Sequence, residues 1–348
     1  SLNVSASPAE DQKLSSLFDD IWHQTMLSNP TYATYVGYPG QNALWPNPSV
    51  SASAENAAQR KEFLMDLRSI NTERLDPDRY LEWMLVEKSL TDEVTGHAYP
   101  EQFILLHQRT GVQQDIADTL SMMPKFNLQD FTDRLARLEN AESYIRSTIE
   151  VLREGLAKGI TPPKITLRDV PEQIRNTIPV DIDKSPLLSS FNGFPDSIGQ
   201  DEQERIKASA RQIIKQQVYP AFESLLQFLE DEYIPNAKTS IALIDMPNGA
   251  EWYRHRAKSF TTSNLTPKQI HQLGLSEVKR IRQEMDKVIA TSGFDGTFEE
   301  FTYFLRTDPQ FYMTSADDLM VGYRDIAKRA DPELAKLFGK LPRMPYGV

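Results

Sequence analysis

The chain has 348 residues, enough for one large domain or two ordinary ones, and 40% hydrophobic with 25% charged residues is typical of a globular protein. Its formal net charge is −11 and no segment clusters lysine or arginine, which argues against nucleic acids and anionic membrane surfaces as partners. The absence of cysteine excludes disulfides and thiolate chemistry within these residues, and no apolar run approaches the about 20 residues of a transmembrane segment.

The first 160 residues predict helices throughout. Apolar residues at helical spacing follow Ser7-Pro8, with Glu10 as a capping-box partner, and Asn29-Pro30 ends this first helix. Beyond a loop over 39–53, the same reasoning predicts helices near 54–70, 77–98, 109–121, 128–138 and 140–158. Asn127 is the expected cap of the helix at 128–138. Residues 1–160 therefore form a predicted N-terminal helical lobe.

Residues 161–200 break this pattern, because six prolines forbid long helices, although a short helix near 171–177 is compatible with them. We interpret this stretch as a proline-rich connector that either joins two lobes or wraps over one surface. Residues 201–348 form the predicted second helical lobe. It opens with a long helix over about 201–234, which Pro220 should kink or divide. It continues with three helices capped by Thr266, Thr297 and Ser315, and a last short turn begins at Asp331-Pro332.

A small β-hairpin is predicted near 239–260. The run from Thr239 to Asp245 is rich in β-branched residues, and Asn248-Gly249 is a dipeptide typical of two-residue hairpin turns. We therefore expect a mainly α fold, a multi-helical array with this hairpin, which forms the wall of a cleft.

The segment from Glu251 to Arg256 is the strongest candidate for ligand contact. As a strand, it would place Tyr253 and His255 on one face and Arg256 on the other. Tyr253, His255 and Arg256 offer a phenol, an imidazole and a guanidinium group to a peptide carboxylate or carbonyl. The alternative is that the aromatic residues pack internally and the arginines pair with the excess acid.

The sequence contains no recognisable catalytic or metal-binding set. None of the five histidines is four residues from another, so the chain lacks a His-Glu-x-x-His helix. His97 and His107 are close enough in sequence to share a metal, but structural or surface roles are the simpler interpretation. Adjacent carboxylates such as Asp317-Asp318 point about 100° apart on a helix and are better explained as solvated faces. We predict no catalytic residue and no metal ligand in these 348 residues.

Short motifs occur in order along nearly the whole chain, and they are specific only as an ordered set. They are Asn29-Pro30-Thr31-Tyr32-Ala33-Thr34, the segment Gly155 to Pro163, Ser185-Pro186-Leu187, Phe194-Pro195, Pro247-Asn248-Gly249 with Tyr253, Leu265-Thr266-Pro267 with His271-Gln272-Leu273-Gly274, the segment Phe304 to Pro309, and Leu341-Pro342-Arg343. This set resembles the bacterial DUF885 family, whose members are envelope-associated and zinc-metallopeptidase-like.

The resemblance implies a helical fold in the style of the gluzincin peptidases, with a deep substrate cleft. It also implies a zinc helix with a His-Glu motif and a further glutamate, neither of which occurs before Val348. No zinc ligand or catalytic glutamate is therefore assigned here, and zinc is implied only for an intact, longer protein. Whether this chain alone is an enzyme is left open.

Our hypothesis is that the chain is the N-terminal, cleft-forming portion of an exported zinc-metallopeptidase-like protein. Its expected partners are a peptide-like substrate and a downstream part of the same protein, and its expected location is periplasmic or lipid-anchored to the cell envelope. The small, polar opening from Ser1 suits a mature start after an export signal, or an arbitrary boundary. The alternative is a non-catalytic, secreted helical module that binds a peptide or another partner.

Overall fold

The computed structural model describes residues 7–348, which form two compact units, the first ending at Asn264 and the second spanning Leu265–Val348. This division differs from the one placed at the proline-rich segment 161–200. Apolar side chains of that segment, among them Leu167, Ile174 and Phe191, are buried in the core of the first unit. The prolines shorten the helices there, but they do not keep the segment out of the core.

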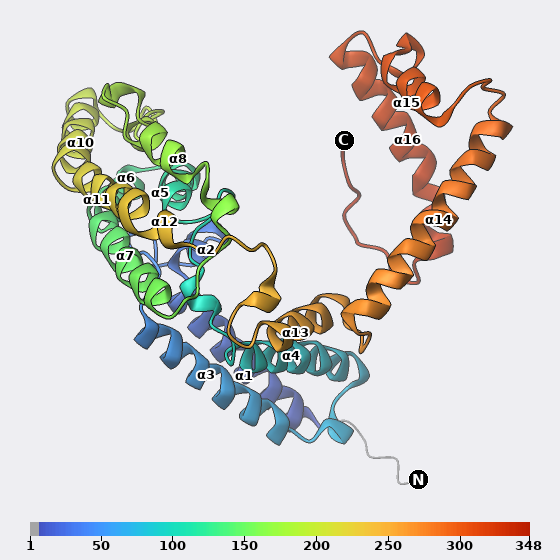
Figure 1. Ribbon diagram of the computed structural model, residues 1–348, viewed down its shortest axis with the longest axis horizontal. Coiled ribbons are helices and arrows are strands. Elements are labelled where there is room, and N and C mark those ends of the chain that lie inside the picture. Colours follow the sequence, from blue (N-terminus) through green and yellow to red (C-terminus); the bar gives the residue numbers. More distant parts are fainter. Residues whose placement is uncertain (1–6) are drawn as a thin grey trace. The chain divides into compact units, whose positions relative to one another are not determined.

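Helices account for most of the described chain (Figure 1). In the first unit they are α1 (Pro8–Ser28), α2 (Pro30–Tyr35), α3 (Val50–Ser69), α4 (Pro77–Gly96), α5 (Val112–Met122), α6 (Leu128–Glu139), α7 (Ala141–Ala157), α8 (Val170–Thr177), α9 (Pro186–Ser189), α10 (Gln200–Ile213), α11 (Tyr219–Phe228), α12 (Ile234–Asn236) and α13 (Gly249–Thr261). The second unit contains α14 (Pro267–Thr291), α15 (Phe298–Thr307) and α16 (Ala316–Leu337). The expected mainly α fold is confirmed.

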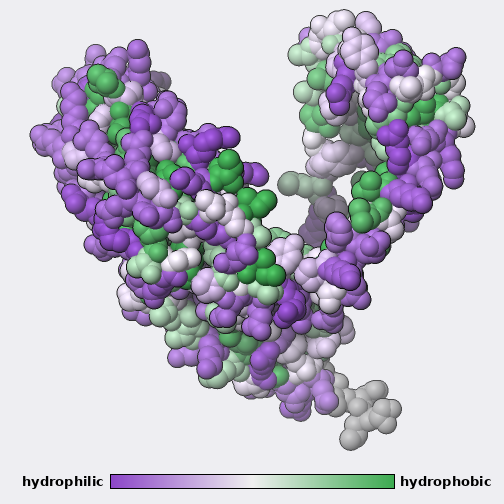
Figure 2. Space-filling view, viewed as in Figure 1, coloured by the Kyte–Doolittle hydropathy of each residue, from purple (hydrophilic) through white to green (hydrophobic). Residues whose placement is uncertain are grey.

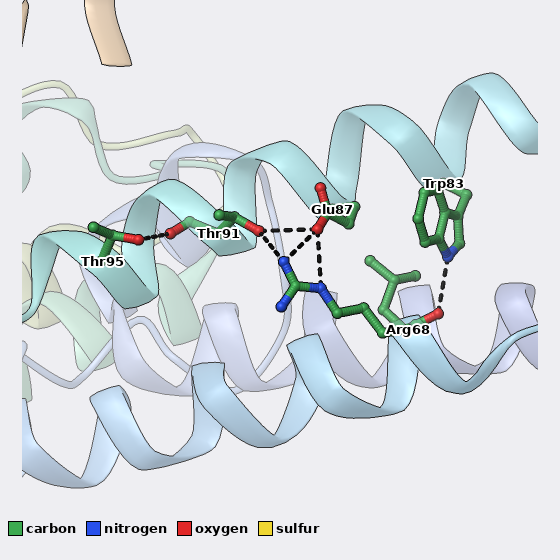
Figure 3. A network of polar contacts seen from close by, with 6 residues as sticks. Arg68, Trp83, Glu87, Thr91 and Thr95 are labelled. Atoms are coloured by element: carbon green, nitrogen blue, oxygen red, sulfur yellow. Dashed lines mark hydrogen bonds and ion pairs between the residues drawn. The ribbon is translucent and has the colours of Figure 1, made fainter. Parts of the chain in front are cut away.

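Helices α1, α3 and α4 pack around one apolar cluster, which includes Leu14, Leu67 and Leu90. Polar contacts fix α3 against α4, as Figure 3 shows. Arg68 of α3 donates through Nε to Glu87 of α4 at 3.0 Å, and the indole of Trp83 donates to the carbonyl of Leu67 at 2.8 Å. These contacts set the spacing of two helices that line the cavity described below.

A larger apolar core joins α5 to α12, and two fully buried arginines hold the loops around it. Arg134 donates to the carbonyl oxygens of Ser190 at 2.6 Å and Met123 at 2.7 Å, and Arg137 donates to that of Gln41 at 2.7 Å. Burial lowers the pKa of both guanidinium groups to about 10, so both stay charged at neutral pH. Arg134 also lies over the rings of Phe131 and Phe191, and Arg137 lies over that of Trp45.

The long helix predicted over 201–234 forms as α10, α11 and α12 separated by two π-helical segments, Ile214–Val218 and Leu229–Tyr233. Pro220 and Pro235 each follow one of these segments by two residues. A proline has no N–H to donate and its ring clashes with the carbonyl four residues earlier. The wider π turn relieves that clash, so the prolines divide the helix as expected without ending it.

The prediction of a β-hairpin near 239–260 is wrong. Residues Leu243–Asp245 form a 3₁₀ turn and Gly249–Thr261 form α13, and no strand occurs in the described chain. Asn248 adopts the left-handed conformation, with φ of 54°, and starts the helix instead of turning a hairpin. At Gly249 a Cβ atom would lie 1.9 Å from the carbonyl oxygen of Leu243, so this close approach requires glycine.

In the second unit the predicted caps form, since the side chains of Thr266, Thr297 and Ser315 each accept a hydrogen bond from the backbone N–H three residues later. Helix α16 continues through Pro332, where a separate turn was predicted. Ile289 is the one buried apolar residue described in this unit. Figure 2 shows hydrophobic side chains exposed on the surface of the unit. Across residues 7–348, no helix is long and apolar enough to cross a membrane.

Candidate functional site

The first unit contains a cavity of about 740 Å³ between α3, α4 and α13, with the end of α1 at its edge. Its lining is rich in charged and hydrogen-bonding groups. It comprises Ser28 of α1; Ser53, Asn56 and Arg60 of α3; Leu85, Lys88, Ser89, Asp92, Glu93 and Gly96 of α4; His97, Tyr99, Glu101 and Gln102 of the following turns; and His255, Arg256, Ser259 and Phe260 of α13.

The period of the α-helix brings these residues together. On α4 they recur at intervals of three and four residues from Leu85 to Gly96, and on α3 they lie at positions 53, 56 and 60. The opposite sides of both helices contribute to the apolar cluster with α1. Each helix therefore has one face in the core and one polar face in the cavity wall.

Glu101 fixes α13 to the turns after α4. Its Oε1 accepts hydrogen bonds from the indole of Trp252 at 2.9 Å and from Nη1 of Arg256 at 2.8 Å. Trp252 is buried, and the ring of Tyr99 stacks on Trp252 and on His255, with centroids 6.2 Å and 5.1 Å apart. The carboxylate of Glu101 therefore fixes the position of Arg256 at the cavity, and the ring of Tyr99 fixes that of His255.

Asp92 is a second carboxylate of the cavity that accepts two hydrogen bonds. Lys88 donates to its Oδ2 at 2.6 Å and Ser259 donates to the same oxygen at 3.2 Å. Partial burial raises the pKa of Asp92, but these hydrogen bonds and the charges of Lys88 and His255 outweigh that effect, so the pKa lies below its ordinary value. The carboxylate is therefore ionised at neutral pH and holds α13 to α4.

The cavity has balanced charge. Lys88, Arg60 and Arg256 face Asp92, Glu93 and Glu101, and each cation has one of these carboxylates within 3.3 Å. At Gly96 the helices α4 and α13 lie close together, since a Cβ atom there would be in van der Waals contact with Nε2 of His255 at 3.4 Å. The arrangement can receive a ligand that carries both charge signs and hydrogen-bonding groups.

The structure separates the three residues predicted to contact a ligand. His255 and Arg256 line the cavity, while Tyr253 is half-exposed and does not. The reason is the change from strand to helix, because residues 252, 255, 256 and 259 share a helical face from which 253 is excluded. The sequence analysis missed Arg60, Asp92 and Tyr99. The only local signal for Arg60 and Asp92 is polar spacing on helices that also have an apolar face, and Tyr99 lies in a turn with no such signal.

The two histidines considered for a shared metal line different cavities. His97 lies at the cavity above, whereas His107 lines one of about 260 Å³ near Pro162 and Lys238. Nδ1 of His107 accepts a hydrogen bond from the backbone N–H of Arg109 at 3.1 Å. Within residues 7–348, no three histidine, aspartate or glutamate side chains form a group suited to a metal ion. The described residues therefore do not fit a zinc site.

The profile of the family described as "Bacterial protein of unknown function (DUF885)" matches residues 30–348. Among solved structures, the "putative lipoprotein from Colwellia psychrerythraea" is similar with a TM-score of 0.82 and 20% identity over 96% of this chain and 61% of that one. A "putative lipoprotein of unknown function from Shewanella oneidensis" is similar with a TM-score of 0.60 and 15% identity over 97% of this chain and 59% of that one.

The chain thus spans about 61% and 59% of the lengths of these two structural relatives, which share its fold. No curated protein matches it significantly.

Proposed function

The chain belongs to the bacterial DUF885 family, and we propose that it binds peptide-like substrates in the cavity between α3, α4 and α13. The observation that carries this proposal is a cavity of about 740 Å³ whose wall has both charge signs next to aromatic rings. That volume lies within the range of about 300–1,000 Å³ found for small-ligand sites.

The chemistry of a peptide matches this wall. A peptide offers an ammonium group at one end, a carboxylate at the other, and alternating donors and acceptors between them. Glu101 suits the ammonium group, Arg60 suits the carboxylate, and Asn56 can pair with an amide. Tyr99 and Phe260 add apolar surface for a side chain.

Peptide hydrolysis belongs to the proposal only for a whole protein of the length of the structural relatives. The family resemblance implies zinc in such a protein, and we derive no chemical step from it because the described residues do not fit a zinc site. In this proposal the present chain supplies the binding wall. We expect no zinc-dependent peptide cleavage by the 348-residue chain, and stoichiometric zinc with such cleavage would overturn this assignment.

An envelope location is the third part of the proposal. Its support is that both structural relatives carry descriptions as lipoproteins. The alternative function, a secreted module that binds a peptide without cleaving it, relies on the same cavity. The two functions differ in whether the whole protein converts the peptide that it binds, which product analysis by mass spectrometry would decide.

The binding test uses tetra-alanine with free termini, titrated into the 348-residue protein by calorimetry. His255→Leu keeps much of the side-chain volume but removes the imidazole from the cavity, and we expect it to weaken binding. Tyr253→Phe is the matched control on the same helix, because Tyr253 does not line the cavity. Equal binding by both variants and the unchanged protein, or no binding at all, would contradict the proposed site.

A further inference from the structure

We infer that Arg60 anchors the C-terminal carboxylate of the bound peptide, so that the site selects peptides with a free C-terminus. This inference rests on the proposed function. Arg60 lies where α1, α3 and α4 meet, and its side chain is 17% exposed. A guanidinium group held in such a wall interacts more strongly with a carboxylate than one in bulk water.

Arg60 has N–H groups that no protein acceptor uses, and it is the least exposed cation of the cavity, because 45% of the side chain is exposed in both Lys88 and Arg256. Its Nη2 donates to Oγ1 of Thr25 at 2.8 Å, and its Nε forms an ion pair with Oε2 of Glu93 at 3.3 Å that is not a hydrogen bond. Among the described residues, Nη1 has no hydrogen-bond acceptor. Arg256 donates to Glu101 and Lys88 donates to Asp92, and both of these side chains are more open to water. Arg60 therefore combines free donors with the least competition from water for a bidentate partner.

Glu93 can yield to a ligand carboxylate. Its side chain is 45% exposed, and Oε1 accepts a hydrogen bond from Ser89 at 3.2 Å. Release of its second oxygen into water therefore costs little, because that oxygen makes no hydrogen bond with Arg60 and the Glu93 side chain already has access to water. A peptide carboxylate would take the place of Oε2 and reach the unused N–H groups of Arg60.

Arg60 also marks a boundary between two cavities. It lines the main cavity and a second one of about 210 Å³, and the two share Ser28 and Asn56 as well. The small volume beyond Arg60 limits how much of a ligand can pass it. A chain end therefore fits at Arg60 better than a chain interior, while the body of the peptide lies in the main cavity.

The experiment compares N-acetyl-trialanine with a free carboxylate and the same peptide with a C-terminal amide. The carboxylate is the only charge that distinguishes them. Two charge-assisted hydrogen bonds predict about 10- to 100-fold tighter binding of the free acid. Arg60→Gln should remove this preference. Arg68→Gln is the matched control, because it removes a positive charge from the same helix outside the cavity.

Glu93→Gln gives a second test that does not remove the arginine. It should tighten binding of the free acid several-fold and leave the amide unchanged. Equal affinity for acid and amide, a preference that survives Arg60→Gln, or no gain from Glu93→Gln would each overturn the inference while peptide binding stands. If neither acetylated peptide binds while tetra-alanine does, the inference fails and the proposed function stands; if tetra-alanine does not bind either, the proposed function itself fails, and the inference with it.

Discussion

Replacement of Arg134 by methionine is the most direct test of what holds the first unit together. Arg134 is fully buried, and its guanidinium donates to the carbonyl oxygens of Ser190, Met123 and Pro124. Methionine fills similar space but donates nothing. Each carbonyl left without a partner costs about 1–3 kcal/mol. The variant no longer has to bury a charged group, and the desolvation free energy that this saves offsets part of the cost of the unpaired carbonyls. We expect a net loss of about 3 kcal/mol in the free energy of unfolding.

Urea unfolding followed by tryptophan fluorescence measures this loss selectively. All four tryptophans lie in the first unit, at positions 22, 45, 83 and 252, so the signal reports on that unit. Arg146→Met is the matched control, because Arg146 is 59% exposed and pairs with Glu142 on the same helix. Such a pair contributes less than about 1 kcal/mol.

The expected difference between these two variants also has a defined pH dependence. The folded-state pKa of Arg134 is about 10, below the ordinary value of 12.5. Below about pH 10 Arg134 is protonated in both the folded and the unfolded state. Only above that pH does the unfolded state bind more protons than the native state, so only there does this group make the native state more stable as the pH rises. From pH 6 to 9 the cost of Arg134→Met should stay constant. A cost within about 1 kcal/mol of the Arg146→Met control would refute the reasoning.

Three further predictions concern the start of α13, the cavity and the second unit. Gly249→Ala should cost about 3 kcal/mol in unfolding free energy, because its Cβ atom meets a backbone carbonyl, whereas Gly199→Ala, with open space around it, should cost less than about 1 kcal/mol. Asp92→Asn should cost about 0.5–1 kcal/mol at pH 7 by the same unfolding assay. Because the folded-state pKa of Asp92 is lowered, that stabilisation is present above the unfolded value of 3.8 and disappears as pH falls through the folded one, so an undiminished difference at pH 3 would contradict it. Finally, the exposed apolar faces of α14 and α16 should bind the dye ANS, and Val278→Lys with Ile326→Lys should lower its fluorescence, whereas equal fluorescence would show that these faces do not bind it.

The helices could be predicted from the sequence because their signals are local. Asn127, Thr266 and Thr297 each accept from the backbone N–H three residues later, in capping boxes that short sequence spacing reveals. The Ser7–Glu10 capping box fails for a tertiary reason. The side chain of Ser7 makes no capping hydrogen bond, and Glu10 accepts instead from the backbone N–H of Asn71, which lies 61 residues away.

The hairpin was predicted because β-branched residues and Asn-Gly are strong short-range signals, but a strand needs a partner. Ile241 and Ile244 are well exposed, so their β propensity is not supported by burial. The competing signal was the helical spacing of Trp252, His255 and Ser259, of which Trp252 is buried. Burial of one indole outweighs the preference of the preceding residues for a strand.

The cavity itself could not be derived from the sequence, because its wall unites residues from Ser28 to Phe260. Besides the contact of Ser259 with Asp92, two hydrogen bonds to a single oxygen of Glu101 join these distant segments, one from the buried Trp252 and one from Arg256 at the cavity. The indole fixes the rotation of α13 through its packing, and that rotation decides which polar residues face α4. Core packing therefore determines the site, and a change at Trp252 should alter ligand binding even though Trp252 does not line the cavity.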